Sequence, residues 1–520
     1  MEALPGVIRY RGRLARLSDD LLPPDVREAN LRTAAEALEA AGVAYGLVPD
    51  GGLAHRVAIA PGDREAALKA WAHACAGLPV YAQLLGDGGE LGEVLVEALP
   101  DAVAAKEAER RPDAGPADED PYQRVKGIRL YEPAVTSGRT LYYGPDHGCD
   151  LEFWEPSDSG TGGVAALRES PYGWWLPSLT ATTAQRVGAR DYPVIDVLAR
   201  RFPNDIDFPV DAVISWVDAS DPAWRRRRDL AAADTDANTR FGVDHAEHRY
   251  RDRGELRYCL RSIAAYAPWI RRIFLVTDGQ IPPWLATDHP GITVVPHREL
   301  FAETDRLPVF NSHAIESQLH RVPGLSEHFL YFNDDMFLGR PQQPQNYFLP
   351  SGLPKVFHDS RAVPPGTPDS TDDVFTASQK TTRLAVEKAV GRTYPHILAH
   401  TPYPLSRSLL AHVEDTLPGL LSATSRSVFR SATDIAPVTL AAHLGLADGR
   451  AVTGELAHAY ISTGRADEIE RLPGLVHDRW PDALCLADDE STTLSAEEQQ
   501  RVVTAFLEAY FPVASPYEKP

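Results

Sequence analysis

Short apolar runs and helically spaced apolar residues alternate along the chain from about residue 208 to residue 335. Four runs have the length and the branched or aromatic side chains of buried strands: VDAVISWV, IRRIFLVTD, ITVVPH and EHFLYFNDD. Two stretches between them, ELRYCLRSIAAYAPW and NSHAIESQLHRVPG, have the spacing of helices. Strands that alternate with helices predict an α/β fold, in which helices flank a mostly parallel sheet on both faces.

The pattern changes after Pro350. The segment VPPGTPDSTDDVF is rich in proline and small polar residues, which predicts a surface loop. Helical spacing then dominates to the end of the chain, most clearly at residues 496–511. We therefore predict one domain over residues 208–520 with a helical C-terminal part.

The N-terminal part has its own, smaller pattern of helices and strands. Its apolar spacing predicts helices at 26–41 and 63–76 and short strands at 44–48, 56–60 and 80–85. The Glu/Ala/Arg-rich stretch 101–120 predicts a helix that runs into an exposed linker. We interpret residues 1–124 as a small accessory α/β domain with its linker.

Residues 125–207 are predicted to be a β-rich connecting segment. GIRLYEPAVTSGRTLYYG has the pattern of a hairpin that turns at Ser137-Gly138, and CDLEFWEP that of a further strand. The aromatic run SPYGWWLPS allows two interpretations. It can form a lid or a platform for an acceptor, but packing in the core is the commoner role of a single tryptophan.

Composition and charge exclude several classes of protein. Hydrophobic residues make up 43% and charged residues 24% of the 520, as in ordinary globular proteins. The net charge of 52 − 73 = −21 argues against general binding to nucleic acid and against strong attraction to an anionic membrane. Four scattered cysteines without a CxxC argue against a disulfide framework or a zinc knuckle. Because no apolar run reaches the ~20 residues of a membrane span and no secretory signal is evident, we expect a cytoplasmic protein with at most weak peripheral membrane contact.

Acidic residues follow three of the predicted strands, and ligands bind beyond the carboxyl ends of strands in an open parallel sheet. A single Asp at such a place is usually a turn former or a helix cap. Three acid-bearing ends on one edge instead favour a site for Mg²⁺ or Mn²⁺, which prefer carboxylate oxygens and substrate phosphates. The residues are Asp218, Asp221, Asp278, Asn333, Asp334 and Asp335.

Basic residues occur between these acids. Arg253, Arg257 and Arg261 are four residues apart, so they share one face of a predicted helix. Such a row is commonly a solvated stripe, but here it begins beside the predicted sheet edge, which favours phosphate contacts. The helix that opens at Asn311 offers backbone N–H groups to an anion and brings His313 and Glu316 to the same end. Because P-loop, GxGxxG and GxSxG motifs are lacking, the residues predict a metal-assisted enzyme that acts on a phosphorylated or nucleotide-linked substrate.

Four stretches resemble, in order, the four conserved regions of the Stealth family. DAVISWVDASDP resembles the first region, and the long stretch from RYRDRGELRYCLRS to HFLYFNDDMFLG resembles the second. AHTPYPLSRSLL with FRSATDIAP is similar to the third region, and CLADDESTTLSAEEQQRVVTAFLEAYF to the fourth. The resemblance extends from about residue 209 to residue 519; residues 1–124 lie outside it, and residues 125–208 resemble the family only loosely.

The resemblance implies a function. The family includes bacterial capsular polysaccharide phosphotransferases and the animal N-acetylglucosamine-1-phosphotransferase α/β subunit. It implies transfer of a sugar-1-phosphate from a UDP-sugar to a hydroxyl of a glycan or glycolipid, with release of UMP, in the synthesis of a cell-surface or capsular polysaccharide. It also implies a requirement for Mg²⁺ or Mn²⁺, and a Rossmann-like, glycosyltransferase-A-like sheet in a catalytic domain at 208–520.

The roles expected from the chemistry and the resemblance divide into three groups. Asp334 and Asp335 are the expected metal ligands. The expected general base is His400, which falls in a family motif and whose side chain titrates near neutrality, with His313 and Asp278 as alternatives; each histidine is otherwise a structural hydrogen-bonding residue. Expected substrate and phosphate contacts are Asp218, Asp221, Arg253, Glu255, Arg257, Arg261, Asn311, Glu316, Asn333 and Arg430.

Two positions depart from the family pattern. Ala487 stands where the fourth region usually has Asn, although Asp488 keeps the acid, and Tyr403 replaces the second His of the third region. These changes affect the expected acceptor contacts. They leave two other functions open, namely a non-catalytic glycan- or nucleotide-binding scaffold and an ordinary glycosyltransferase that releases UDP. The sequence does not specify the donated sugar, the acceptor or the oligomeric state.

Overall fold

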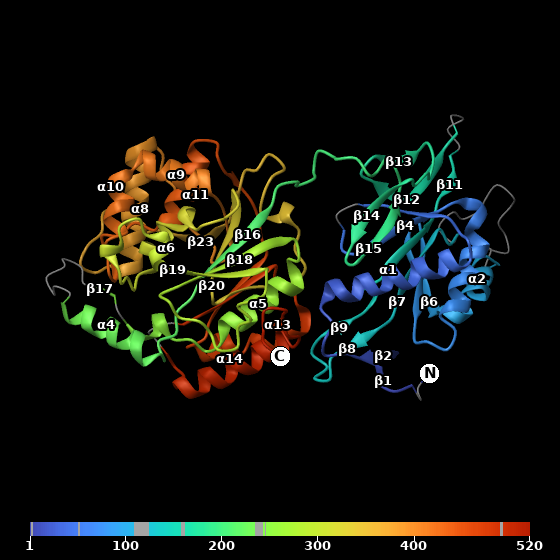
Figure 1. The fold of residues 1–520 in the computed structure, drawn as a ribbon, viewed down its shortest axis with the longest axis horizontal. Helices are drawn as coiled ribbons and strands as arrows, with labels where there is room; N and C mark the ends of the chain where they lie inside the picture. Colours follow the sequence, from blue (N-terminus) through green and yellow to red (C-terminus); the bar gives the residue numbers. More distant parts are fainter. Residues whose placement is uncertain are drawn as a thin grey trace. The chain divides into compact units, whose positions relative to one another are not determined.

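The computed structural model of the chain describes residues 1, 4–49, 52–108, 124–157, 162–234, 243–244, 246–488 and 492–520. These residues form two compact units, Met1–Pro203 and Asn204–Pro520. Each unit has its own sheets and helices (Figure 1). The predicted mixture of strands and helices is confirmed, and residues 489–490 of the predicted CLADDE motif lie outside the described part.

An eight-stranded sheet is the centre of the N-terminal unit. Its strand order is β14-β15-β3-β4-β10-β7-β5-β6. Helices α1 (Pro23–Ala40), α2 (Arg64–Ala74) and α3 (Leu99–Ala108) pack on it through a core that includes Leu31, Trp71 and Leu99. The strands are β3 (Tyr45–Leu47), β4 (His55–Ile59), β5 (Tyr81–Gly86), β6 (Gly89–Leu95), β7 (Gly127–Tyr131), β10 (Cys149–Phe153), β14 (Thr183–Val187) and β15 (Arg190–Val194).

The predicted boundary at residue 124 falls inside this sheet, because β7 pairs with β5 and β10 pairs with β4. The predicted hairpin at Ser137-Gly138 is only partly present. β8 (Ala134–Val135) and β9 (Tyr142–Tyr143) pair across that turn, whereas β7 pairs with β5 and β10. β1 (Val7–Tyr10) and β2 (Arg13–Leu17) extend the β8–β9 pair to four strands.

A three-stranded sheet follows β10 in the chain. It consists of β11 (Glu155–Pro156), β12 (Val164–Ser170) and β13 (Gly173–Leu176), with β12 in the middle. β13 carries the two adjacent tryptophans of the predicted aromatic run. Both are exposed, so the expectation that core packing explains them is wrong.

A five-stranded sheet forms the core of the C-terminal unit, in the order β19-β18-β16-β20-β25. β16, β18, β19 and β20 are parallel, and β25 runs antiparallel to β20. In register, Ser215 at the end of β16 lies beside Asn333 at the end of β20, and Tyr331 of β20 lies beside Tyr403 at the start of β25. The end of β20 and the start of β25 therefore share one sheet edge. The strands are β16 (Val210–Ser215), β18 (Ile270–Thr277), β19 (Ile292–Pro296), β20 (His328–Asn333) and β25 (Tyr403–Ser406).

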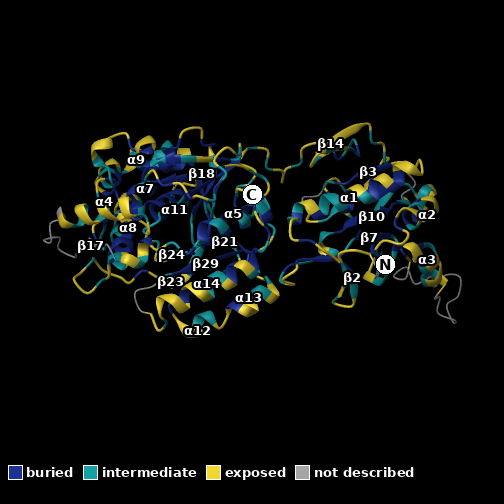
Figure 2. Ribbon diagram, turned by 60° about the horizontal axis from the view of Figure 1, so that its bottom comes forward, coloured by how far each residue is buried: buried dark blue, intermediate teal, exposed yellow. Residues whose placement is uncertain are grey.

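Helices cover both faces of this sheet, as the sequence predicted. Val213, Phe329 and Tyr331 point to a face that packs against α8 (Val374–Val390), α9 (Arg407–Thr416) and α11 (Pro437–Ala447). Successive strand residues point to opposite faces, so Ile214 and Leu330 point the other way. On that side, α14 (Ala496–Tyr510) packs against α5 (Glu255–Tyr266) and α13 (Leu472–Asp478), and Figure 1 shows the three close together. In Figure 2, α14 carries both buried and exposed residues.

The prediction of a helical C-terminal part is wrong in one respect, because short strands interrupt the helices. β21 (Met336–Leu338), β28 (His458–Ser462) and β29 (Ala483–Ala487) form a buried sheet with β29 in the middle. Strands of two to five residues give too little alternation to be recognised in a sequence. Further short pairs are β17 (Val243–Asp244) with β26 (Arg430–Ser431), β22 (Lys355–Val356) with β27 (Val452–Thr453), and β23 (His358–Ala362) with β24 (His396–Leu398).

The remaining helices are short, apart from α4. The predicted helix at 311–324 is only α7 (Ser312–Glu316) followed by one 3₁₀ turn, Leu319–Arg321. The chain reaches Pro323 two residues later, and proline does not continue a helix. The others are α4 (Pro222–Asp234), α6 (His297–Leu300), α10 (Pro418–Thr424) and α12 (Ala466–Ile469).

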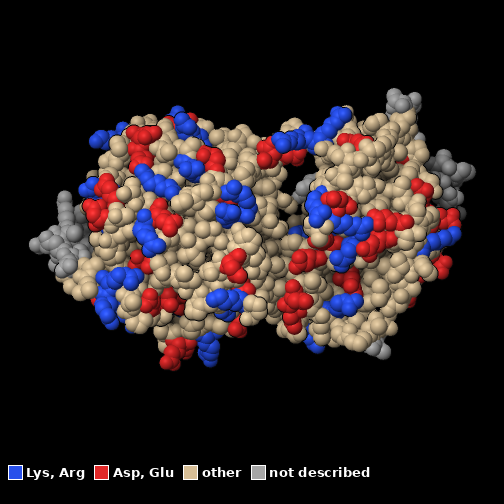
Figure 3. Space-filling model, in the orientation of Figure 1, with Lys and Arg blue, Asp and Glu red and all other residues tan. Residues whose placement is uncertain are grey.

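Acidic and basic side chains are interspersed on the face of the molecule shown in Figure 3. That face carries no broad area of one sign, although the chain as a whole has a net charge of −21. Among the helices of the described residues, none combines the length and the apolar character needed to cross a membrane.

Candidate active site

The polar turn after β20 connects two buried strands of different sheets. Phe332 of β20 and Met336 of β21 are both fully buried, and only Asp334 and Asp335 separate the strands as a turn. Because each apolar run enters its own sheet, the two carboxylates are left at the junction between the sheets. Asn333, the last residue of β20, has a side-chain oxygen that is buried and accepts no hydrogen bond from the described residues.

Asp335 faces a histidine and a cysteine from distant parts of the chain. Its Oδ1 lies 3.6 Å from Nε2 of His400, and its Oδ2 lies 3.5 Å from Sγ of Cys485. Asn333 also reaches this histidine, with its Nδ2 3.4 Å from Nε2. One potential ligand atom from each of Asp335, His400 and Cys485 lies within 4.8 Å of the others. The turn after β20, the loop before β25 and strand β29 thus meet at one point.

Two tyrosines flank the imidazole of His400. The hydroxyl of Tyr403 lies 3.0 Å from Nδ1, and the ring of Tyr460 approaches edge-on at 6.2 Å between centroids. Tyr403 is deeply packed, and burial, followed by the charge of Glu316, raises the pKa of its hydroxyl well above the ordinary value. Tyr403 therefore stays a neutral phenol that fixes one edge of the imidazole.

Carboxylates crowd the other side of the turn. Burial raises the pKa of Asp334 well above its ordinary value, and the charges of Asp335, Glu255 and Asp252 add to the effect. Burial, with Asp252 as a further contribution, raises the pKa of Glu255 to about 7. Asp252 is raised in the same way by burial and by Asp218. The site holds more negative charge than its own side chains neutralise.

Two arginines of the second region reach the fourth region here. Arg253 is buried, and its Nη2 lies 3.0 Å from Oδ2 of Asp488, which also accepts a bond from Arg251 at 2.8 Å. Arg253 Nη2 also donates to Gln499 in α14, and its Nη1 lies 3.9 Å from Glu255. Arg253 is thus engaged with protein groups at the border of the carboxylate cluster.

The carboxylate cluster fits a divalent cation. Buried oxygens of Asp335, Asn333 and Asp488 accept no hydrogen bond from the described residues. Unpaired buried oxygens beside several carboxylates are a donor set that suits Mg²⁺ or Mn²⁺. Among the described residues, the grouped potential ligands are Asp335, His400 and Cys485, and the expected ligand Asp334 is not among them. The thiol of Cys485 is a softer donor and is a poor match to either metal.

The predicted residues of α7 form a second, buried group with Arg430. Asn311 caps α7 by accepting from the N–H of His313, and its Nδ2 donates to Asp434 at 2.8 Å. Burial lowers the pKa of His313 well below its ordinary value, with a further contribution from Arg430. Burial raises the pKa of Glu316 to about 7 despite the nearby Arg430, which itself donates to the hydroxyl of Ser312. This group joins the second and third regions by hydrogen bonds.

Arg257 and Arg261 have contacts that differ from the predicted phosphate contacts. Both pair with Glu518, at 3.6 Å and 2.8 Å, and Arg261 also donates to the carbonyl of Phe511. Arg257 further lies over the ring of Trp284 at 4.9 Å. The row therefore ties the C-terminal segment to α5.

The acids after β16 and β18 contact α4 or the turn that precedes it. The N–H of Ser220 donates to Asp218, and the N–H of Ala223 donates to Asp221, whose pKa is lowered chiefly by a hydrogen bond from Gln280. Asp278 forms an ion pair with Arg227 of α4 at 2.6 Å. The contacts of Asp218 and Asp221 are the turn and capping contacts that the sequence left as alternatives, whereas Asp278 forms an ion pair. Asp218 also helps to raise the pKa of Asp252.

The comparisons with known sequences agree with this arrangement. Profiles of Stealth conserved regions 1, 2, 3 and 4 match residues 208–235, 249–356, 399–444 and 473–520. An exopolysaccharide phosphotransferase of Streptomyces coelicolor is 38% identical over 538 residues, which cover 100% of this chain and 87% of that protein. The chain belongs to the Stealth family.

Other relatives match this Stealth protein over nearly its whole length. A second exopolysaccharide phosphotransferase of Streptomyces coelicolor is 42% identical over 99% of the chain, which spans 53% of that relative. The exopolysaccharide phosphotransferase CpsY of Mycobacterium tuberculosis is 35% identical over 99% of the chain and 92% of its own length. The similarity therefore includes the N-terminal unit. A mouse xyloside xylosyltransferase 1 structure covers 53% of the chain at a TM-score of 0.28 and 9% identity, which is too low to support an argument.

The Stealth regions converge on the turn after β20. The second region contributes Asp334 and Asp335, the third contributes His400 and the fourth contributes Cys485. Cys485 and Asp252 were not expected as site residues. A single Cys in an apolar run is typical of a core residue, and an Asp between two arginines is typical of a surface residue. Their places in the site are therefore evident only from the contacts in the folded structure.

Proposed function

We propose that the chain is a phosphotransferase of polysaccharide synthesis that moves a sugar-1-phosphate from a UDP-sugar to a glycan hydroxyl. In this reaction the acceptor oxygen forms a bond to the phosphorus that carries the sugar. The bond from that phosphorus to the bridging oxygen breaks, and UMP leaves. The observation that carries the proposal is the meeting of Asp335 and His400 beside a cluster of uncompensated carboxylates. The printed names of the relatives, exopolysaccharide phosphotransferases, agree with it.

His400 is the residue that we assign as general base. If Nδ1 donates its hydrogen to the Tyr403 oxygen, Nε2 carries the lone pair; it faces Nδ2 of Asn333 at 3.4 Å and can accept the proton of the acceptor hydroxyl in place of that contact. Asp335, 3.6 Å from Nε2, then stabilises the imidazolium that forms. His313 is a weaker candidate because burial opposes its protonated form.

Asp334 and Asp335 would hold a divalent cation. When bound, Mg²⁺ or Mn²⁺ supplies positive charge against the diphosphate of the donor. Asp252 and Glu255 surround this position and keep its potential negative, so they favour the cation over a bare anionic donor. Arg251 is exposed at the border of the cluster and is the arginine best placed to meet a phosphate.

We further propose that the five-stranded sheet is a Rossmann-like, glycosyltransferase-A-like platform, because its carboxyl edge carries the proposed donor site. The acceptor is a glycan or a glycolipid. A cytoplasmic location, with at most weak membrane contact, agrees with the acidic net charge.

The test is an assay of the purified chain with a panel of UDP-sugars, Mg²⁺ or Mn²⁺ and oligosaccharide acceptors, with mass detection of both products. We expect UMP and a phosphodiester. The variant Asp335→Asn should abolish product while the chain stays folded. Its matched control is Asp448→Asn, because Asp448 also pairs with a histidine, His412, on the surface of the same unit.

Each alternative function gives a different result. Release of UDP with a glycosidic product would identify an ordinary glycosyltransferase. A non-catalytic scaffold would be identified by two observations together. The unmodified chain would show no turnover under any condition of the panel, and the Asp335→Asn variant would still bind the donor. Either result would refute the proposed transfer.

A further inference from the structure

A stretch of four residues in the N-terminal unit, 172–175, exposes three large aromatic side chains. Tyr172 at the turn between β12 and β13 is 53% exposed, and Trp174 and Trp175 of β13 are 46% and 62% exposed. Solitary exposed aromatics are common, but adjacent ones mark binding surfaces, where tryptophan and tyrosine supply much of the affinity. We refer to these three residues as the aromatic hairpin.

The strand geometry leaves both faces of the aromatic hairpin open. β13 is an outer strand of its sheet, paired only with β12 among the described strands. Trp174 and Trp175 are consecutive, so their rings point to opposite faces of the strand. Trp175 lies beside Ala165 of β12, whose small side chain does not cover an indole. Two broad aromatic surfaces are thus presented at one edge.

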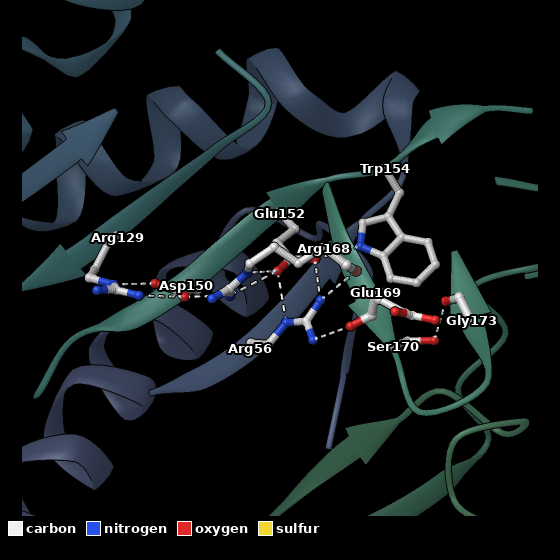
Figure 4. A network of polar contacts seen from close by, with 9 residues as sticks. All are labelled: Arg56, Arg129, Asp150, Glu152, Trp154, Arg168, Glu169, Ser170 and Gly173. Carbon is white, nitrogen blue, oxygen red and sulfur yellow. Dashed lines mark hydrogen bonds and ion pairs between the residues drawn. The ribbon is translucent and has the colours of Figure 1, made fainter. Parts of the chain in front are cut away.

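A buried arginine holds the base of the aromatic hairpin in place (Figure 4). Arg56 forms an ion pair with Glu152 at 2.8 Å, in which the two side chains are 2% and 0% exposed. The same guanidinium donates to the backbone carbonyls of Arg168 and Glu169 at 2.9 Å and 3.0 Å, so it fixes the end of β12 to the main sheet. Arg56 therefore couples the core of the unit to the strand that leads into the turn.

The turn itself is also fixed. The hydroxyl of Ser170 donates to the carbonyl of Gly173 at 2.7 Å, across the turn (Figure 4). Trp154, in contrast, is fully buried and donates its indole N–H to Glu152. The segment thus buries one tryptophan completely and presents two others on a rigid support. A rigid support reduces the entropy lost when a ligand binds.

The segment that carries the aromatic hairpin favours a neutral ligand, because the segment itself bears no charge. Residues 171–185, PYGWWLPSLTATTAQ, contain no charged residue, whereas charged residues make up 24% of the whole chain. Hydroxyl side chains follow the aromatics, and Ser178, Thr180 and Thr182 lie on the exposed surface or at its border. Uncharged aromatic rings next to hydroxyl side chains match the chemistry of a sugar. A pyranose has an apolar C–H face that can stack on an aromatic ring and a rim of hydroxyls that can form hydrogen bonds.

We propose that the aromatic hairpin is a carbohydrate-binding site that stacks sugar rings of a neutral stretch of glycan chain on Trp174 and Trp175. The choice of a glycan over another neutral ligand rests on the proposed function. The site belongs to the N-terminal unit, whereas the residues of the proposed reaction centre belong to the C-terminal unit.

The test measures binding without turnover. The Asp335→Asn chain is run in native gels that contain dextran, mannan or arabinogalactan, and its tryptophan fluorescence is titrated with the same soluble polymers. We expect retardation and a change of tryptophan emission with at least one polymer. Trp174→Ala with Trp175→Ala should weaken that binding roughly tenfold or more, the scale of 1.4 kcal/mol. The matched control is Trp480→Ala, which removes a similarly exposed tryptophan (44%) and should leave binding unchanged.

Other outcomes would overturn the proposal. They are retention of full polymer binding by the double variant, or binding of neutral or anionic phospholipid vesicles through Trp174 and Trp175 without any polymer binding. A concentration-dependent dimer that the double variant abolishes, again without polymer binding, would assign the surface to a second copy of the chain. The single variant Trp175→Ala supplies the same comparison if the double variant misfolds. UMP release is measured separately, so failure of this proposal and failure of the proposed reaction give different results.

Discussion

Glu316 predicts how the stability of the C-terminal unit changes with pH. Its carboxyl is buried, and the pKa rises from the ordinary 4.5 to about 7. The ionised group is therefore less favourable in the folded chain than in the unfolded chain. A rise of one pKa unit corresponds to 1.36 kcal/mol, so ionising Glu316 costs the folded chain about 3 kcal/mol more than the unfolded chain.

The direction of the pH dependence follows from whether the folded or the unfolded chain binds the proton of Glu316 more tightly. Between pH 4.5 and about 7 the folded chain keeps the proton of Glu316 and the unfolded chain loses it. The contribution of this group to stability is complete below pH 4.5 and is lost as the pH rises through about 7. Gln is a permanently neutral analogue, so Glu316→Gln should gain stability relative to the parent as the pH rises.

The assay is urea unfolding of the parent and of Glu316→Gln at several values between pH 5 and pH 8, followed by circular dichroism and tryptophan fluorescence. The difference in unfolding free energy should move in favour of the variant by about 2–3 kcal/mol over this range. Glu414→Gln is the control without pH dependence in this range: hydrogen bonds and charge from Arg321 lower the pKa of Glu414 against the effect of burial, so the group is ionised in both states above pH 5 and its difference should stay constant. A difference for Glu316→Gln that stays constant over the range would refute the reasoning.

Three further predictions concern the site and the N-terminal unit. His400→Ala should reduce UMP formation by about 10²-fold or more, as loss of a general base does, whereas His412→Ala, whose side chain is equally exposed at 28%, should retain turnover in the same assay. Mg²⁺ or Mn²⁺ should raise the midpoint of thermal unfolding, because a ligand that binds only the folded chain stabilises it by mass action. Asp334→Asn should lose that shift, whereas His412→Ala should keep it. An identical shift in both variants would exclude Asp334 as a ligand. Arg56→Met should destabilise the N-terminal unit by about 1.5–3 kcal/mol, because it removes the charged hydrogen bonds of Arg56 to the buried Glu152, which keeps only Arg168 and the indole of Trp154. A change in the unfolding free energy of the unit of less than about 1 kcal/mol would contradict the role of the ion pair.

Long, regular elements were predictable from the sequence, and short ones were not. The strands β16, β18, β19 and β20 and the helices α5 and α14 lie where their apolar periods predicted them, within a few residues. The strand β29 was missed, because five buried residues with little alternation resemble any core segment. α7 was overestimated because the pattern of 311–324 continues after the backbone has left the helix.

In the candidate site, too, some positions were predictable from the sequence and others were not. The carboxyl ends of parallel strands meet at one edge by topology, so the positions of Asn333, Asp334 and Asp335 followed from the strand pattern. The arginine row illustrates what spacing leaves undetermined. Arg257 and Arg261 share α5 as predicted, whereas Arg253 precedes the helix. Arg257 and Arg261 contact Glu518, which is more than 250 residues away in the chain. A helical face can be predicted from spacing, whereas the segment that packs against it depends on tertiary structure.

Tyr403 connects the two buried groups of the C-terminal unit. Its hydroxyl lies 3.0 Å from Nδ1 of His400, and the charge of Glu316 contributes to its raised pKa. A histidine at this position could carry a charge beside Nδ1, whereas a buried phenol stays neutral and can both donate and accept one hydrogen bond. Tyr403 therefore supplies a neutral contact that orients His400. It also places beside Nδ1 of His400 a group whose protonation does not change near neutral pH.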